Sequence, residues 1–150
     1  MRRAIATATV PGRVVEAEEL WYDPHRWAAW VDGFGHVARL EGDWPAVGSR
    51  LLWDSPPRGR GRVAETMTAY EPRSGCTVEV EDERMYATQT VQFEPDGFDQ
   101  VRVTLALEWQ LKERPRFEGL IRPLFVRRAM RDSLRRTLAR FAHERRAEIA

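Results

Sequence analysis

Residues 101–111 read VRVTLALEWQL, and this stretch decides the fold of the chain. Apolar side chains occupy every second position from Val101 to Leu111, whereas the positions between them are mostly polar, as at Arg102 and Glu108. An extended chain places successive side chains on opposite faces, so this period of two predicts a β-strand with one buried and one solvated face. We expect that strand to cover residues 99–112.

The same alternation continues toward the N-terminus and is interrupted by turn residues. Interruptions such as Pro72-Arg73-Ser74-Gly75 and Pro95-Asp96-Gly97 combine residues that favour tight turns. Short connections of this kind join neighbouring antiparallel strands, so the pattern predicts a curved antiparallel sheet of about seven strands. The further strands are expected at about residues 3–10, 35–42, 48–55, 61–71, 75–82 and 85–94.

Two short helices are expected between the first and second strands. Apolar residues recur at helical spacing from Val14 to about Asp23. Asp23 then serves as the N-cap and Pro24 as the first residue of a second helix, which carries Trp27 and Trp30.

A long C-terminal helix is expected after Pro115. Its apolar stripe runs through about 30 residues, which corresponds to roughly 45 Å, and comprises Leu120, Leu124, Phe125, Met130, Leu134, Leu138, Phe141 and Ala142. A sheet with one apolar face needs a cover, and this stripe supplies one. The sequence therefore predicts an α+β fold, with residues 1–150 forming a single domain.

The composition excludes several classes of protein. The chain is 43% hydrophobic and 31% charged, the balance of a soluble globular protein. Its longest apolar run, residues 27–31, is far shorter than the roughly 20 residues that cross a bilayer. Residues 4–10 lack the apolar core of a signal peptide, and the single cysteine, Cys76, excludes an internal disulfide. We therefore expect a cytoplasmic location.

The order of elements and four motifs resemble the START-like superfamily, also labelled SRPBCC or polyketide cyclase/dehydrase, which has the helix-grip fold. The motifs are Asp23-Pro24 with the following Trp27 and Trp30, residues 42–49 (GDWPAVGS), residues 68–72 (TAYEP) and the closing helix over residues 125–141. The resemblance implies an apolar cavity between sheet and long helix, holding a lipid, polyketide, quinone or other hydrophobic molecule. Members of the superfamily include carriers, cyclases and interaction factors, so the fold leaves the function open.

The large residues on the inward faces are the candidate ligand contacts. Aromatic rings and methionines adapt to apolar ligands, and one amide would orient a polar group. The alternative is that these residues simply fill a core. The candidates are Trp53, Met67, Met85, Gln89, Leu105, Leu107, Trp109, Phe125 and Met130.

Two titratable residues are weak candidates for catalysis. Glu65 shares its strand face with Val63, Met67 and Ala69, and a carboxyl against an apolar cavity has a raised pKa suited to acid or base chemistry. Alternatively, Glu65 pairs with an arginine such as Arg62 or lies at the rim. His36 could carry a proton inward, or it could be a structural hydrogen-bonding group.

No cofactor or metal is expected. The three histidines and Cys76 show no metal-ligand spacing, the serines lack a nucleophile elbow, and Gly33-Phe34-Gly35 lacks the third glycine of a dinucleotide loop. If the protein is an enzyme, we expect a cyclase or dehydratase that works without metal.

The basic charge is concentrated at the C-terminal end. Residues 101–150 carry 13 basic and 6 acidic residues, although the whole chain has a net charge of only +1. The arginines of the long helix could bind anionic lipid headgroups or RNA phosphates, or they could simply form the solvated face of an amphipathic helix. DNA is not an expected partner. Three hypotheses follow: a binder of a hydrophobic molecule, an enzyme, and an interaction module that docks through its basic helix.

Overall fold

The predicted strands form one antiparallel sheet in the computed structural model, which describes residues 2–112 and 123–150, with only the backbone for 123–125. The sheet order is β1-β7-β6-β5-β4-β3-β2. Each strand from β2 to β6 pairs with the strand that follows it along the chain, and β1 pairs with β7 to form the other edge of the sheet. The strands are β1 (Arg2–Pro11), β2 (His36–Glu41), β3 (Arg50–Asp54), β4 (Arg62–Glu71), β5 (Gly75–Glu81), β6 (Met85–Pro95) and β7 (Gln100–Leu111).

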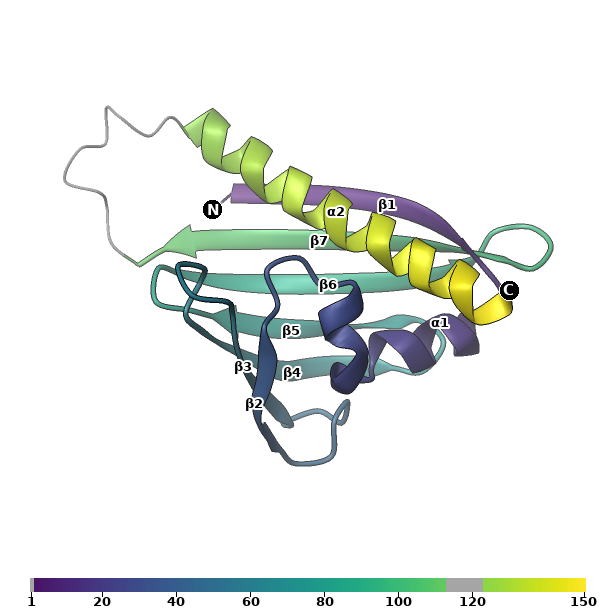
Figure 1. The fold of residues 1–150 in the computed structure, drawn as a ribbon, viewed down its shortest axis with the longest axis horizontal. Coiled ribbons are helices and arrows are strands. Elements are labelled where there is room, and N and C mark those ends of the chain that lie inside the picture. Colours follow the sequence, from purple (N-terminus) through teal and green to yellow (C-terminus); the bar gives the residue numbers. More distant parts are fainter. Residues whose placement is uncertain (1, 113–122) are drawn as a thin grey trace.

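The helices lie together on one side of this curved sheet (Figure 1). They are α1 (Val14–Trp21), the 3₁₀ helix η1 (Pro24–Ala29) and α2 (Pro123–Ile149). Asp23 caps η1 as predicted, because its Oδ1 accepts a hydrogen bond from the backbone nitrogen of His25 at 3.2 Å. The α+β helix-grip architecture expected from the sequence is therefore confirmed.

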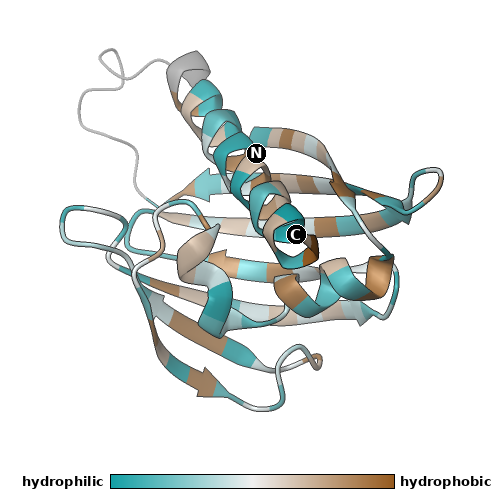
Figure 2. Cartoon of the chain, turned by 45° about the vertical axis from the view of Figure 1, so that its right-hand side comes forward, coloured by the Kyte–Doolittle hydropathy of each residue, from teal (hydrophilic) through white to brown (hydrophobic). Residues whose placement is uncertain are grey.

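The long helix α2 packs mainly along β1. Leu134, Leu138, Phe141 and Ala142 of the predicted apolar stripe are buried. The opposite face of the helix is hydrophilic (Figure 2). Leu120 and the side chains of Leu124 and Phe125 lie outside the described residues. No helix in the described ranges has both the length and the apolar character that crossing a membrane requires.

Two irregularities in strand pairing change the predicted faces. The register of β4 against β5 shifts between Met67 and Ala69, so Ala69 is exposed although the alternation placed it inward. A second shift, between Val37 and Arg39 in β2, accompanies the loss of a regular inward face at that edge strand. A bulge adds one residue to one strand and reverses the side-chain phase beyond it.

Candidate functional site

A cavity of about 780 Å³ lies between the concave face of the sheet and α2. Ligand sites in proteins typically measure about 300–1,000 Å³, so this space suits a small organic molecule. Its walls come from α1, η1, α2 and five strands, β3 to β7. Close packing normally leaves no void of this size in a protein core.

Five tryptophans form one wall of the cavity: Trp21, Trp27, Trp30, Trp44 and Trp53. Trp27 lies in η1, and Trp30 is the C-cap residue that follows the helix, one 3₁₀ turn of three residues later, so both rings reach the cavity. The ring of Trp30 lies 4.7 Å from that of Trp21 and 6.1 Å from that of Trp27, measured between centroids. Trp27 Nε1 also donates to the carbonyl of Trp21 at 2.8 Å, which fixes the ring in place.

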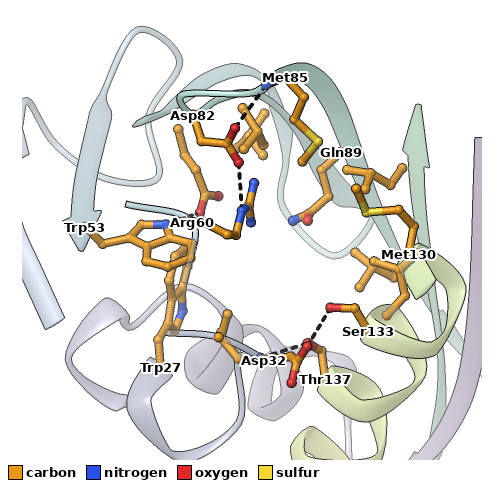
Figure 3. A pocket seen from close by; sticks show the side chains of 18 of the residues that line it. Trp27, Asp32, Trp53, Arg60, Asp82, Met85, Gln89, Met130, Ser133 and Thr137 are labelled. Carbon is orange, nitrogen blue, oxygen red and sulfur yellow. Dashed lines mark hydrogen bonds and ion pairs between the residues drawn. The ribbon is translucent and has the colours of Figure 1, made fainter. Parts of the chain in front are cut away.

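The facing wall is aliphatic, with one amide. Met85 and Gln89 reach it from β6 and Met130 from α2 (Figure 3). Leu105 and Leu107 line it from β7. The alternation predicted from the sequence places these strand residues correctly, since all of them point to the concave face. The amide of Gln89 is the polar group expected on this wall.

The structure brings together most of the predicted site residues. Trp53, Met85, Gln89, Leu105, Leu107, Met130 and Glu65 line the cavity. Met67 and Trp109 do not border it: they point inward but are packed into the core, so for them the core-filling alternative holds. The side chain of Phe125 lies outside the described residues. That any of these residues contacts a ligand stays a prediction.

His36 does not reach the cavity. Its side chain is 72% exposed, and its Nε2 lies 3.4 Å from Asp54 Oδ2. The expected inward orientation is wrong because Val37, its neighbour in β2, is the residue that packs against the core. The two catalytic candidates, His36 and Glu65, are therefore not brought together.

Glu65 is buried at one end of the cavity. Trp53 Nε1 donates a hydrogen bond of 2.7 Å to its Oε2. Burial raises the pKa of the Glu65 carboxyl above its ordinary value, while the Trp53 hydrogen bond and the charge of Arg60 act in the opposite direction. Arg62, the partner suggested by the sequence, instead holds Asp54 with hydrogen bonds of 2.8 and 3.0 Å.

Arg60 and Asp82 complete this polar end, and the sequence pattern placed neither of them in the cavity. Arg60 Nε donates to Asp82 Oδ2 at 2.8 Å, and the guanidinium carbon lies 5.6 Å from the centroid of the Trp53 ring. Asp82 Oδ1 accepts from the backbone nitrogens of Arg84 at 2.8 Å and Met85 at 3.0 Å. Both residues lie in connections between strands, where the alternation of apolar and polar residues does not predict which way a side chain points.

Asp32 lies at another part of the cavity lining and ties the loop after η1 to α2. Its Oδ2 accepts from Ser133 Oγ at 2.7 Å, and its backbone nitrogen donates to Thr137 Oγ1 at 3.0 Å (Figure 3). Arg136 and Arg140 pair with the same carboxylate from the outside of the helix. These contacts hold α2 over the cavity.

Cys76 lies in the cavity wall as a small buried side chain, in agreement with its alternation with Val78 and Val80. Burial raises the pKa of its thiol to about 12. The thiolate, which is the nucleophilic form, is therefore disfavoured at neutral pH. No group of three or more metal-ligating side chains occurs among residues 2–112 and 123–150.

The arginines of α2 are not one uniform solvated face. Arg145 is buried, where it donates to the carbonyl of Pro11 at 3.1 Å and pairs with Glu148. Together with the contacts of Arg136 and Arg140 to Asp32, this shows that part of the predicted basic surface serves the fold.

Replacing Glu65 with glutamine is expected to stabilise the protein at neutral pH. The raised pKa means that the folded protein holds a proton that the unfolded chain releases above about pH 4.5. The wild-type free energy of unfolding therefore falls as the pH rises from 4.5 through the raised pKa, by at most about 1.4 kcal/mol per pH unit. Glutamine keeps an oxygen for Trp53 and has no charge to bury.

Urea unfolding of both proteins between pH 4 and pH 8 measures this effect. The advantage of Glu65→Gln should be largest at neutral pH and should vanish below pH 4.5, where both side chains are neutral. Glu71→Gln, at an exposed position of the same strand, is the control and should show no comparable trend. An advantage of equal size at every pH would contradict a raised pKa for Glu65.

The architecture is shared with proteins of known structure. A family model described as polyketide cyclase / dehydrase and lipid transport matches residues 1–144. A search among curated proteins finds no match. The chain is similar to a protein from Thermus thermophilus at 21% sequence identity, with 99% of this chain and 100% of that chain covered and a TM-score of 0.77.

Norcoclaurine synthase from Thalictrum flavum has the same fold. The alignment with its truncated form has 15% sequence identity, covers 94% of this chain and 91% of that chain, and gives a TM-score of 0.68. Its complex with dopamine and hydroxybenzaldehyde is 19% identical, with 88% and 83% covered and a TM-score of 0.59. At these identities the likeness establishes the fold alone.

Proposed function

The chain belongs to the polyketide cyclase / dehydrase and lipid transport family, and from that membership we propose that it binds a hydrophobic small molecule in the cavity between sheet and α2. A lipid, a polyketide or a quinone would suit the site. The family match also confirms the resemblance to START-like proteins drawn from the motifs of the sequence.

The observation that carries the proposal is the cavity itself. An open cavity of about 780 Å³ walled by indole rings and methionines leaves apolar surface in contact with water, and an apolar ligand would displace that water. Indole rings also offer large contact areas with little loss of side-chain entropy. The ring contacts and the Trp27 hydrogen bond hold this surface in place before a ligand arrives.

Two measurements test the proposal. Organic extraction and mass spectrometry of the purified protein, beside an unrelated protein from the same host, would reveal a co-purifying apolar compound. Titration with N-phenyl-1-naphthylamine, a neutral apolar dye that fluoresces when it leaves water, would measure the capacity of the cavity directly. We expect saturable binding of about one dye per chain.

Replacing Val78 with phenylalanine is expected to weaken dye binding by at least about tenfold, because the larger ring fills space that the ligand needs. Val78 lines the cavity and is buried. Val47→Phe is the matched control, since Val47 is 63% exposed and does not line the cavity. Equal dye affinities in both variants would show that the dye binds elsewhere, and the proposal would fail.

A second function, acid–base catalysis in a cyclase or dehydratase, is favoured by one observation. Glu65 is buried beside the cavity with a raised pKa, so its carboxyl can hold and release a proton next to a bound molecule. The co-purified compound, incubated with wild type and with Glu65→Gln, would decide. Loss of water or ring closure only with the wild type supports catalysis, and an unchanged compound with both supports binding alone.

A further inference from the structure

The polar end of the cavity indicates the chemical class of the ligand. We propose that the ligand is a hydrophobic acid, with an apolar body between the tryptophan and methionine walls and a single carboxylate bound to the guanidinium of Arg60. This inference rests on the proposed binding function and adds the group by which the ligand is oriented.

Arg60 has a hydrogen-bond donor that the described residues leave without an acceptor. Its Nε is bound to Asp82, but its Nη2 is buried and has no hydrogen-bond partner. A buried donor on a charged group costs free energy when it is unpaired. The Arg60 side chain borders the cavity and is 35% exposed, so its guanidinium is within reach of an acceptor on a bound molecule (Figure 3).

The guanidinium is held in position before a ligand binds. Asp82 fixes it through Nε, and the Trp53 ring lies against it at 5.6 Å. Asp82 is itself held by the backbone nitrogens of Arg84 and Met85, and Trp53 by Glu65. The entropy of ordering this long side chain is therefore lost on folding rather than on binding, which favours affinity.

The charges around this end of the cavity favour a single negative charge. Near Arg60 the basic lining residues are Arg58, Arg60, Arg84 and Lys112, and the acidic ones are Glu65, Asp82 and Glu83. Asp32, the remaining acidic residue of the lining, is paired with Arg136 and Arg140 of α2. Lys112 is paired with Glu81 outside the lining, at 2.7 Å. The remaining three arginines face two carboxylates and the buried Glu65, whose protonated form burial favours. Positive charge therefore predominates near Arg60, which suits an anionic head group.

A carboxylate fits the free donor better than an alcohol does. Hydrogen bonds between two charged groups are roughly twice as strong as those between neutral groups. The amide of Gln89 lies on the facing wall and offers the ligand a further polar contact. Apart from Gln89 and the group of Asp32, Ser133 and Thr137, the rest of the lining is mostly apolar, so the body of the ligand would be hydrocarbon or aromatic.

The test compares decanoic acid with decan-1-ol as competitors of N-phenyl-1-naphthylamine at pH 8, where the acid is ionised. The two compounds have the same chain length and differ in the head group. We expect the acid to displace the dye from the wild type at a concentration at least about tenfold lower than the alcohol. Arg60→Gln should weaken acid binding by about 10- to 100-fold and leave alcohol binding within about twofold.

Two further variants keep the test decisive. Arg62→Gln removes an arginine that is paired with Asp54 and does not line the cavity, so acid binding should stay unchanged. Arg60→Lys keeps the charge without the planar fork and should keep part of the preference for the acid. If Arg60→Gln does not fold, the wild-type preference and the Arg60→Lys result still decide.

The outcomes separate this inference from the function on which it rests. Equal displacement by acid and alcohol, with binding of both abolished in Val78→Phe, would overturn the hydrophobic acid and leave the binding function intact. If Arg60→Gln weakened the binding of decanoic acid and decan-1-ol equally, the hydrophobic acid would also be overturned and the binding function would also stand. No binding of dye, acid or alcohol would overturn both proposals.

Discussion

Replacing Asp82 with alanine is expected to lower the free energy of unfolding by about 2 to 4 kcal/mol. The carboxylate is buried, pairs with Arg60 and accepts two backbone hydrogen bonds from the turn between β5 and β6. Alanine would leave two backbone donors of the turn without acceptors, which is the main cost, and it would remove the ion partner of Arg60, whose side chain is 35% exposed. Urea unfolding monitored by circular dichroism would measure the loss.

Two variants separate the roles of this carboxylate. Asp82→Asn keeps an oxygen that can accept from the turn, so it should lower the free energy of unfolding less than Asp82→Ala does. It loses the charge that holds Arg60, so binding of decanoic acid should still be weakened. Asp54→Ala is the matched control, because Asp54 pairs with Arg62 at a solvated position of a neighbouring hairpin, where ion pairs contribute little. If the two alanine variants were equally stable, the Arg60–Asp82 pair would not be a buried support of the site.

Replacing Phe141 with alanine is expected to destabilise the protein by about 3 to 5 kcal/mol. Phe141 is fully buried on α2, and its ring meets those of Trp21 and Trp30 edge-on at 5.2 and 4.9 Å between centroids. It therefore supports the tryptophan wall from behind. Its loss should also weaken dye binding, because Trp21 and Trp30 would no longer be held in place.

Phe98→Ala is the matched control for this substitution. Phe98 is 98% exposed in the turn between β6 and β7, so removing its ring creates no cavity and should change the stability by less than about 0.5 kcal/mol. Thermal and urea unfolding would compare the two variants. Similar losses in both would mean that Phe141 is not part of the packed support of the cavity.

The order of the elements was predictable because the relevant interactions are local. A period of two and clusters of turn residues mark a strand and its ends without reference to any other part of the chain. The strand expected at residues 85–94 is Met85–Pro95, and that expected at 99–112 is Gln100–Leu111. The inward directions of Glu65, Gln89 and Leu105 follow from the same alternation.

The composition of the site was predictable only in part. Met67 and Trp109 lie on the inward face, yet neighbouring side chains cover them, and alternation cannot distinguish a core residue from one that borders a void. His36 belongs to an edge strand with a register shift, where the period of two is broken. The ion pair of Arg60 with Asp82 joins two connections that are 22 residues apart.

Three features could therefore be predicted from the sequence: the order of strands and helices, the inward face of the regular strands, and the amphipathic closing helix. Each of them depends on the spacing of side chains along a few residues. The three-dimensional structure was needed to show where the cavity lies, which arginine lies near Glu65, and that Arg60 Nη2 has no hydrogen-bond partner among the described residues. These features depend on how separate loops and strands meet in space, and on bulges that change the side-chain phase, and no local spacing encodes either.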